Sequence, residues 1–109
     1  MINKNTIFRC ILCTHHTTIL HEVFPGRGNR KPCIEYNVQV PLCPECHTKA
    51  HATYSPNHEK RADDYAKDFC EYLGVDYWSA YRAIHQKSFR TYLDGYKSQF
   101  KQKIMSLTA

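Results

Sequence analysis

The stretch Leu42-Cys43-Pro44-Glu45-Cys46-His47 decides the fold of this chain. Its two cysteines have C-x-x-C spacing, and a second pair with the same spacing, Cys10-Ile11-Leu12-Cys13, lies near the N-terminus. Each C-x-x-C knuckle can present two sulfurs to one ion, and tetrahedral Zn²⁺ is satisfied by four thiolates at about 2.3 Å. The spacing therefore predicts a structural zinc ion bound by Cys10, Cys13, Cys43 and Cys46, which would tie the N-terminal segment to the middle of the chain.

The cysteine count allows two alternatives to a zinc site. An even number, here six, also fits a disulfide scaffold, but such a scaffold requires an oxidising compartment. The N-terminal residues lack the apolar segment of a secretory signal, so we expect a cytoplasmic protein with reduced thiols. A thioredoxin-like pair would need a βαβ pattern around one knuckle, and the sequence has none. Cys33 and Cys70, which lie outside both pairs, are interpreted as small buried side chains.

Length and composition limit the class of protein. A chain of 109 residues suffices for a single domain, 1–109, but not for two independent cores. Hydrophobic residues make up 42% and aromatic residues 13%, which excludes a disordered tail, a collagen-like repeat and a coiled coil. No apolar run approaches the roughly 20 residues that span a bilayer. The formal charge of +5 falls to +3 with zinc bound, because four thiolates add −4 and Zn²⁺ adds +2, and this mild excess favours a polyanionic partner.

Two strands are predicted between the cysteine pairs. Residues 18–24 are rich in β-branched and aromatic side chains and end at the turn signal Pro25-Gly26. We predict a strand there, then a basic loop over 27–32, then a second strand over 38–42. Asn37 stands at the entrance of the second strand, where its tolerance of left-handed backbone would make the turn.

A helix is predicted from about residue 44 to residue 53. Proline suits the first helical position, so Pro44 marks its start. Helical spacing places His47 and His51 one above the other on the same face. Taken alone, these two histidines could simply face solvent. Because the facing strand carries His21 and Glu22, we interpret them as metal ligands.

The C-terminal half, residues 55–107, is predicted to be helical. One helix begins at Ser55-Pro56 and ends at Gly74, and Asp76 caps a second helical segment. Whether residues 77–106 form one helix or two with a break near 86–88 stays open. The apolar and aromatic positions of these helices have helical spacing, and we expect them to complete the core.

The run 20–26, which reads LHEVFPG, and the stretch from Leu42 to His51 together resemble the HNH (His-Me finger) endonucleases. More narrowly, they resemble the compact members with a four-cysteine zinc site that are common in bacteriophages and mobile elements. The resemblance covers residues 10–52 and implies a location in a bacterial or phage-infected cell. It implies an α+β fold, with a zinc-clamped ββα-metal core over 10–53 and a helical C-terminal extension over 55–107.

The family's site residues carry over by position. In that family a strand pair supplies one metal ligand and the general base, and helix residues supply the other ligands. The resemblance therefore makes His21 and Glu22 the strand pair, and His47 and His51 ligands of one catalytic divalent metal, Mg²⁺, Mn²⁺ or Zn²⁺. The middle asparagine of the motif has Asn37 as a candidate, and Asn29 as a further one.

The order His-Glu departs from the family's usual Asp-His or His-His pair, in which the base comes second. Register alone would make His21 the ligand and Glu22 the base. Chemistry favours the reverse, because a carboxylate suits a hard cation and an imidazole that titrates near 6.5 is the better proton acceptor at neutral pH. We favour His21 as the base, and both assignments stay open.

The resemblance implies a hydrolase, a metal-dependent nuclease that cleaves phosphodiester bonds of DNA by nicking or by double-strand cleavage. Arg27, Arg30 and Lys31 in the basic loop could bind the flanking phosphates. The alternative is a catalytically inactive HNH-like zinc module that binds nucleic acid or a protein partner. The expected partner is DNA and not a membrane. The aromatic helix face could also pair with a second copy to form a homodimer.

Overall fold

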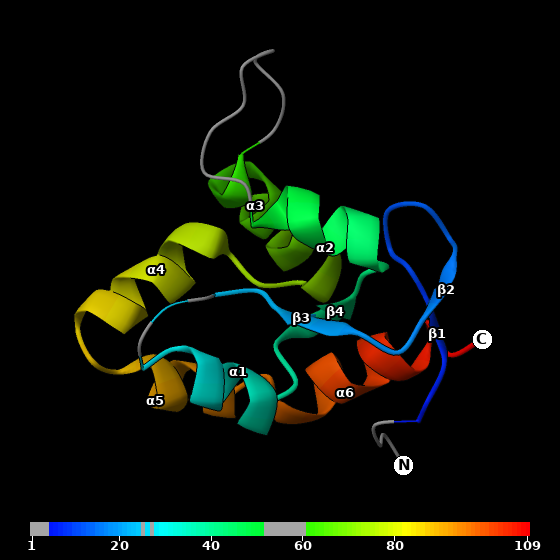
Figure 1. Ribbon diagram of the computed structural model, residues 1–109. Coiled ribbons are helices and arrows are strands. Elements are labelled where there is room, and N and C mark those ends of the chain that lie inside the picture. The colour runs from blue at the N-terminus through cyan, green and yellow to red at the C-terminus, as the bar shows by residue number, and fades with distance from the viewer. Residues whose placement is uncertain (1–4, 25, 27, 52–60) are drawn as a thin grey trace.

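Two short antiparallel strand pairs form the N-terminal half of the computed structural model, which describes residues 5–24, 26, 28–51 and 61–109 (Figure 1). β1 (Phe8–Arg9) pairs with β2 (His16–Thr17), and β3 (Leu20–Glu22) pairs with β4 (Gln39–Pro41). In the second pair His21 lies opposite Val40. With the helices that follow, the described chain is a small α+β protein.

β3 is shorter than the strand predicted over 18–24, because the side chain of Thr17 intervenes just before it. The Thr17 hydroxyl donates a hydrogen bond to the Leu42 carbonyl at 2.9 Å and accepts one from the Ile19 N–H at 3.1 Å. These side-chain bonds interrupt the regular ladder in the link between β2 and β3, where the Ile19 carbonyl still accepts a bond from the Leu42 N–H at 3.1 Å. At the other end, pairing continues to the bond from the Val23 N–H to the Val38 carbonyl.

The loop predicted over 27–32 is wrong in its second half, because α1 (Arg30–Glu35) begins there. Pro32 occupies the third helical position, where the N–H that proline lacks would have had no partner within the helix. After α1 the chain turns at Asn37, whose φ of 61° is the left-handed conformation expected for it. Arg27 lies outside the described residues.

α2 (Pro44–Ala50) begins with its proline at the predicted position. His51 closes its C-terminal end, and its N–H donates to the carbonyls of His47 and Thr48. The helix was predicted to reach residue 53, but residues 52 and 53 lie outside the described chain. Cys46 and Ala50 face the core, and His47 is only partly buried.

Four helices follow. α3 (Ala62–Leu73) ends where predicted, at Gly74 with φ 79°, whereas its predicted start at Ser55-Pro56 lies outside the described residues. Asp76 caps α4 (Tyr77–His85) by accepting a hydrogen bond from the Ser79 N–H at 2.8 Å, as expected.

The segment 77–106 contains more breaks than the sequence indicated. A break at 86–88 separates α4 from α5 (Phe89–Asp94), and a further one at 95–96 precedes α6 (Lys97–Met105). At the first break Lys87 adopts a φ of 57°, and the Ser88 N–H bonds to the Ala83 carbonyl, which closes the end of α4.

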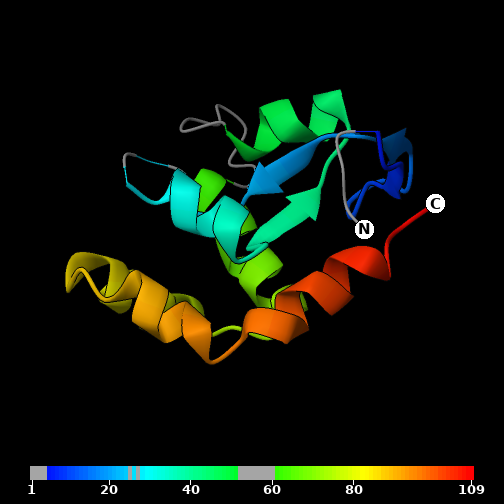
Figure 2. The same ribbon diagram turned by 90° about the horizontal axis from the view of Figure 1, so that it is seen from below.

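The helices of the C-terminal half share one core with side chains of the N-terminal half, such as Val23, Val40 and Leu42. Figure 2 shows α6 running beneath β3 and β4 toward the C-terminus, which pairs with the N-terminal strand through Thr108 and Phe8. Phe69, Leu93 and Phe100 are at most 1% exposed, in agreement with the core predicted for the helical stripe. Cys33 and Cys70 are also buried, as predicted. None of the described helices combines the length and apolar character needed to cross a membrane.

Candidate metal centres

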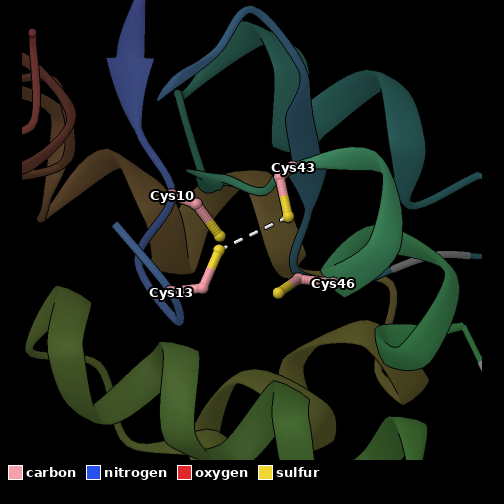
Figure 3. Close-up of side chains that lie close together, drawn as sticks. All are labelled: Cys10, Cys13, Cys43 and Cys46. Atoms are coloured by element: carbon pink, nitrogen blue, oxygen red, sulfur yellow. Dashed lines mark hydrogen bonds between the residues drawn. The ribbon is translucent and has the colours of Figure 1, made fainter. Parts of the chain in front are cut away.

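Four cysteine sulfurs converge where the N-terminal turn meets the start of α2 (Figure 3). The ligand atoms of Cys10, Cys13, Cys43 and Cys46 all lie within 4.8 Å of one another, and the Sγ atoms of Cys13 and Cys43 are 3.5 Å apart. All six cysteines are free thiols, so no disulfide competes for these sulfurs. The cluster could bind a structural metal ion, and four sulfurs suit tetrahedral Zn²⁺.

Local backbone geometry holds each pair of cysteines in place. In the first knuckle, Cys10 donates its N–H to the His15 carbonyl at 2.7 Å, and Thr14 takes a φ of 67° to complete the turn. In the second, Cys43 precedes Pro44 with extended backbone, so the helix begins directly after it. The two knuckles are joined by the bond from the Ile11 N–H to the Pro41 carbonyl at 3.0 Å.

Four thiolates in this space would repel one another, and a bound cation would offset that repulsion. Burial opposes the thiolate of Cys10, but hydrogen bonds from the backbone at Cys43, Leu12 and Cys13 lower its pKa to about 7. Burial raises the pKa of Cys46, and the neighbouring sulfurs raise it further, because a second negative charge in the same space is repelled. A divalent ion at the centre would remove that repulsion.

A second cluster consists of three histidines from two different elements. His21 comes from β3, while His47 and His51 come from one face of α2. One ring nitrogen of each histidine lies within 4.8 Å of a nitrogen of the other two, and the Nε2 atoms of His47 and His51 are 3.0 Å apart. The ring of His21 is 4.9 Å from that of His51 and 5.2 Å from that of His47. Within the described chain, Glu22 is not part of this set.

The state of His21 fits a metal ligand. Its side chain is 3% exposed, and its Nδ1 is buried with no hydrogen-bond partner among the described residues. A buried nitrogen without a partner is costly unless an ion or other group satisfies it. Burial, followed by repulsion from His51 and His47, lowers the pKa of His21 to about 4. Burial and His51 also lower the pKa of His47. Neutral imidazole is the form that binds a metal ion.

Glu22 and Arg30 share a cavity of about 490 Å³ with the three histidines. Arg30, at the start of α1, donates from Nε to Oε1 of Glu22 at 2.9 Å. The Glu22 side chain is 17% exposed, so the ion pair is partly shielded from solvent on the carboxylate side. The sequence indicated Arg30 only as a phosphate contact, and its pairing with Glu22 was not foreseen.

The remaining candidate residues are distributed around this cavity. Lys31 lines an adjoining cavity of about 630 Å³ that also includes Arg30. Asn29 and Asn37 do not line the cavity that holds the histidines. His15, which follows the first knuckle, has its Nδ1 3.5 Å from the Sγ of Cys13.

Comparison with known proteins found no matching family model, no matching curated protein and no matching solved structure. The chain is thus characterised by its own geometry, which is that of a small α+β protein with two antiparallel sheets in its described part and a four-cysteine cluster able to bind a structural metal ion.

Proposed function

We propose that this protein is a metal-dependent endonuclease of the HNH type that hydrolyses phosphodiester bonds of DNA. The observation that carries the proposal is the cluster of three imidazoles, His21 on β3 with His47 and His51 on α2, in a cavity that also contains a carboxylate. An antiparallel strand pair followed by a helix, with ligands on one strand and on the helix, is the arrangement that the ββα-metal core requires.

In this proposal the three histidines hold the divalent ion. His21 belongs with the ligands because one of its ring nitrogens lies within 4.8 Å of a nitrogen of His47 and of His51, and because its buried Nδ1 has no partner in the described part of the chain. This reverses the preference drawn from side-chain chemistry alone and agrees with the register of the strand pair. When bound, the ion would neutralise charge on the scissile phosphate and stabilise the leaving oxygen.

Glu22 then acts as the general base. Its carboxylate lies in the same cavity as the histidines and would accept a proton from the attacking water. The ion pair with Arg30 fixes one carboxylate oxygen, so the carboxylate keeps one orientation. Arg30 is therefore a positioning residue in this scheme, and Lys31 is left as the described cation of α1 for a flanking phosphate.

The four-cysteine cluster supports this site from one end of α2. Cys43 and Cys46 fix the start of the helix that carries His47 and His51, and the first knuckle anchors that start to the N-terminal segment. A closed four-thiolate site leaves no open coordination position, so a zinc ion there would have a structural role.

Supercoiled plasmid tests the proposal. The zinc-loaded protein is incubated with plasmid and Mg²⁺, Mn²⁺ or Zn²⁺, alongside His47→Ala and Glu22→Gln. His16→Ala, an exposed histidine outside the cluster, is the matched control. We expect nicked or linear product that requires the added ion, His47 and Glu22, and that persists in the control. Retardation of DNA without product under any of these ions would assign the chain to the alternative, a zinc module that binds without cleaving.

A further inference from the structure

A second cavity, of about 330 Å³, adjoins the three-histidine cluster. His21 borders both cavities, so the two meet at this side chain. Its lining comes from β3 and the chain that follows it, from the end of α2, and from α3 and α4. Its polar and aromatic lining includes Asn29, Asp63, Tyr77, Tyr81 and His85. Its volume lies at the lower end of the roughly 300–1,000 Å³ found for ligand pockets.

The face of α4 toward this cavity carries a row of rings. Tyr77, Tyr81 and His85 are four residues apart and so lie on one side of the helix. Phe24 packs against Tyr77 at 5.8 Å between ring centroids, which fixes the base of the row in the core. Tyr81 follows, with its ring 4.4 Å from that of His85, and it remains 43% exposed. Trp78, on the next position of the helix, is 56% exposed.

The charges near the rings suit a nucleotide. Outside the residues that line the cavity, the Lys67 ammonium lies 4.9 Å from the centre of the Trp78 ring and provides a cation near the row. Asn29 offers an amide to the cavity and Asp63 a carboxylate, and these can bond to the donor and acceptor edge of a base. A carboxylate would repel a phosphate, so this cavity suits the base and not the backbone of a strand.

We propose that this cavity binds an unpaired nucleobase of the strand whose scissile phosphate lies at the three histidines. The inference rests on the proposed function, because it uses the shared border at His21 to place the base beside the cleaved phosphate. Bases stack on aromatic side chains irrespective of sequence, whereas a base inside a duplex is inaccessible to such a pocket unless it is flipped out. The preferred substrate is therefore single-stranded or locally unpaired nucleic acid.

The test compares affinities for a fluorescent 12-nucleotide single strand and for the same sequence as a duplex. Both are measured by anisotropy with the zinc-loaded protein and no added Mg²⁺ or Mn²⁺. Tyr81→Ala removes the ring, Tyr81→Phe retains it, and thermal melting verifies that both variants fold. We expect Tyr81→Ala to weaken single-strand binding about tenfold and duplex binding less than twofold, and Tyr81→Phe to bind as the unmodified protein does.

A single strand with 2-aminopurine in place of one base supplies a second readout, because stacking quenches its fluorescence. Quenching that Tyr81→Ala abolishes and Tyr81→Phe keeps supports the base site. Equal losses on single strand and duplex, or no loss on either, would overturn it. If the protein cleaves plasmid but Tyr81→Ala changes neither strand affinity nor quenching, the nuclease proposal stands and the base site is refuted. Tyr81-dependent single-strand binding without cleavage would leave the base site standing without the nuclease.

Discussion

The two halves of the molecule are stabilised in different ways. In the N-terminal half, the strands have two or three residues each and α2 has seven, lengths too short for stability without further support. The helical half contains a helix of 12 residues, α3, and it contributes Phe69 and Phe100 to a core to which the N-terminal half adds Phe8 and Leu42. The residues with metal-binding chemistry thus belong to the half with the least regular structure. We expect a half of this kind to depend on bound ions and on the core that it shares with its neighbour.

Removal of the structural metal is expected to have the largest effect. Binding of zinc contributes about 10–16 kcal/mol of apparent free energy in zinc-finger peptides, and here the ion would fix two separate knuckles. In Cys43→Ser we expect zinc content to fall and amide hydrogen exchange to accelerate over residues 8–51 far more than over α3–α6. Cys70→Ala, a buried cysteine outside the cluster, should keep its zinc. Equal loss of protection in both halves would show that they do not differ in this way.

Truncation of Phe100 tests whether the fold also depends on the core that the helical half contributes. This side chain is 0% exposed, on the helix that packs beneath β4. We expect Phe100→Ala to lower the free energy of unfolding by about 3–5 kcal/mol, measured by urea denaturation. The exposed Met105→Ala on the same helix should change it by less than about 0.5 kcal/mol. If both variants behave alike, α6 is not the support that the N-terminal half requires.

The ion pair between Glu22 and Arg30 can be tested within the catalytic proposal. We expect Glu22→Gln to lower the cleavage rate by about 10²- to 10⁴-fold and Arg30→Ala by about tenfold. If Arg30 acts by orienting Glu22, then Arg30→Ala has no further effect in the Glu22→Gln background. If the rate losses of Arg30→Ala and Glu22→Gln multiply in the double variant and KM rises, Arg30 contacts the phosphate directly.

The cap of α4 gives the smallest expected effect and is confined to the helical half. Asp76→Ala should lower the Tm by roughly 5 °C, while Asp76→Asn, which keeps a side-chain acceptor, should lower it less. The hydrogen bonds from Ser79 hold the pKa of Asp76 below its ordinary value. The contribution of this carboxylate is therefore complete above about pH 4 and is lost as the pH falls through the lowered pKa. At pH 2 the Tm values of Asp76→Ala and the unmodified protein should therefore approach each other. The same difference in Tm at pH 2 as at neutral pH would show that the ionised carboxylate is not the cause.

Features of the fold with a local cause were predictable from the sequence. Pro44 at the start of α2, Gly74 at the end of α3 and the cap at Asp76 depend on one residue and its immediate neighbours. The convergence of the cysteines followed from spacing and from the small number of geometries that four sulfurs allow. α1 was missed because Pro32 resembles a loop residue when its position within the helix is unknown.

Features that depend on packing were not predictable. Helical spacing shows which residues of α4 share a face, but not that the face with Tyr81 borders a cavity beside His21. The pairing of Arg30 with Glu22 depends on where α1 packs against β3, which no local pattern specifies. In the candidate site, the sequence supplied the histidines and the carboxylate, and the tertiary arrangement groups His21 with the two histidines of α2.

We expect the position of α2 to couple metal binding at the two clusters. Cys46 and His47 are adjacent, so α2 carries candidate ligands of both clusters, with His51 of the second cluster at its C-terminal cap. An ion at either cluster restricts the same rigid element, and we expect each to raise the affinity of the other. Thermodynamic linkage makes this cooperativity reciprocal: the factor by which zinc at the cysteines tightens metal binding at the histidines equals the factor in the opposite direction.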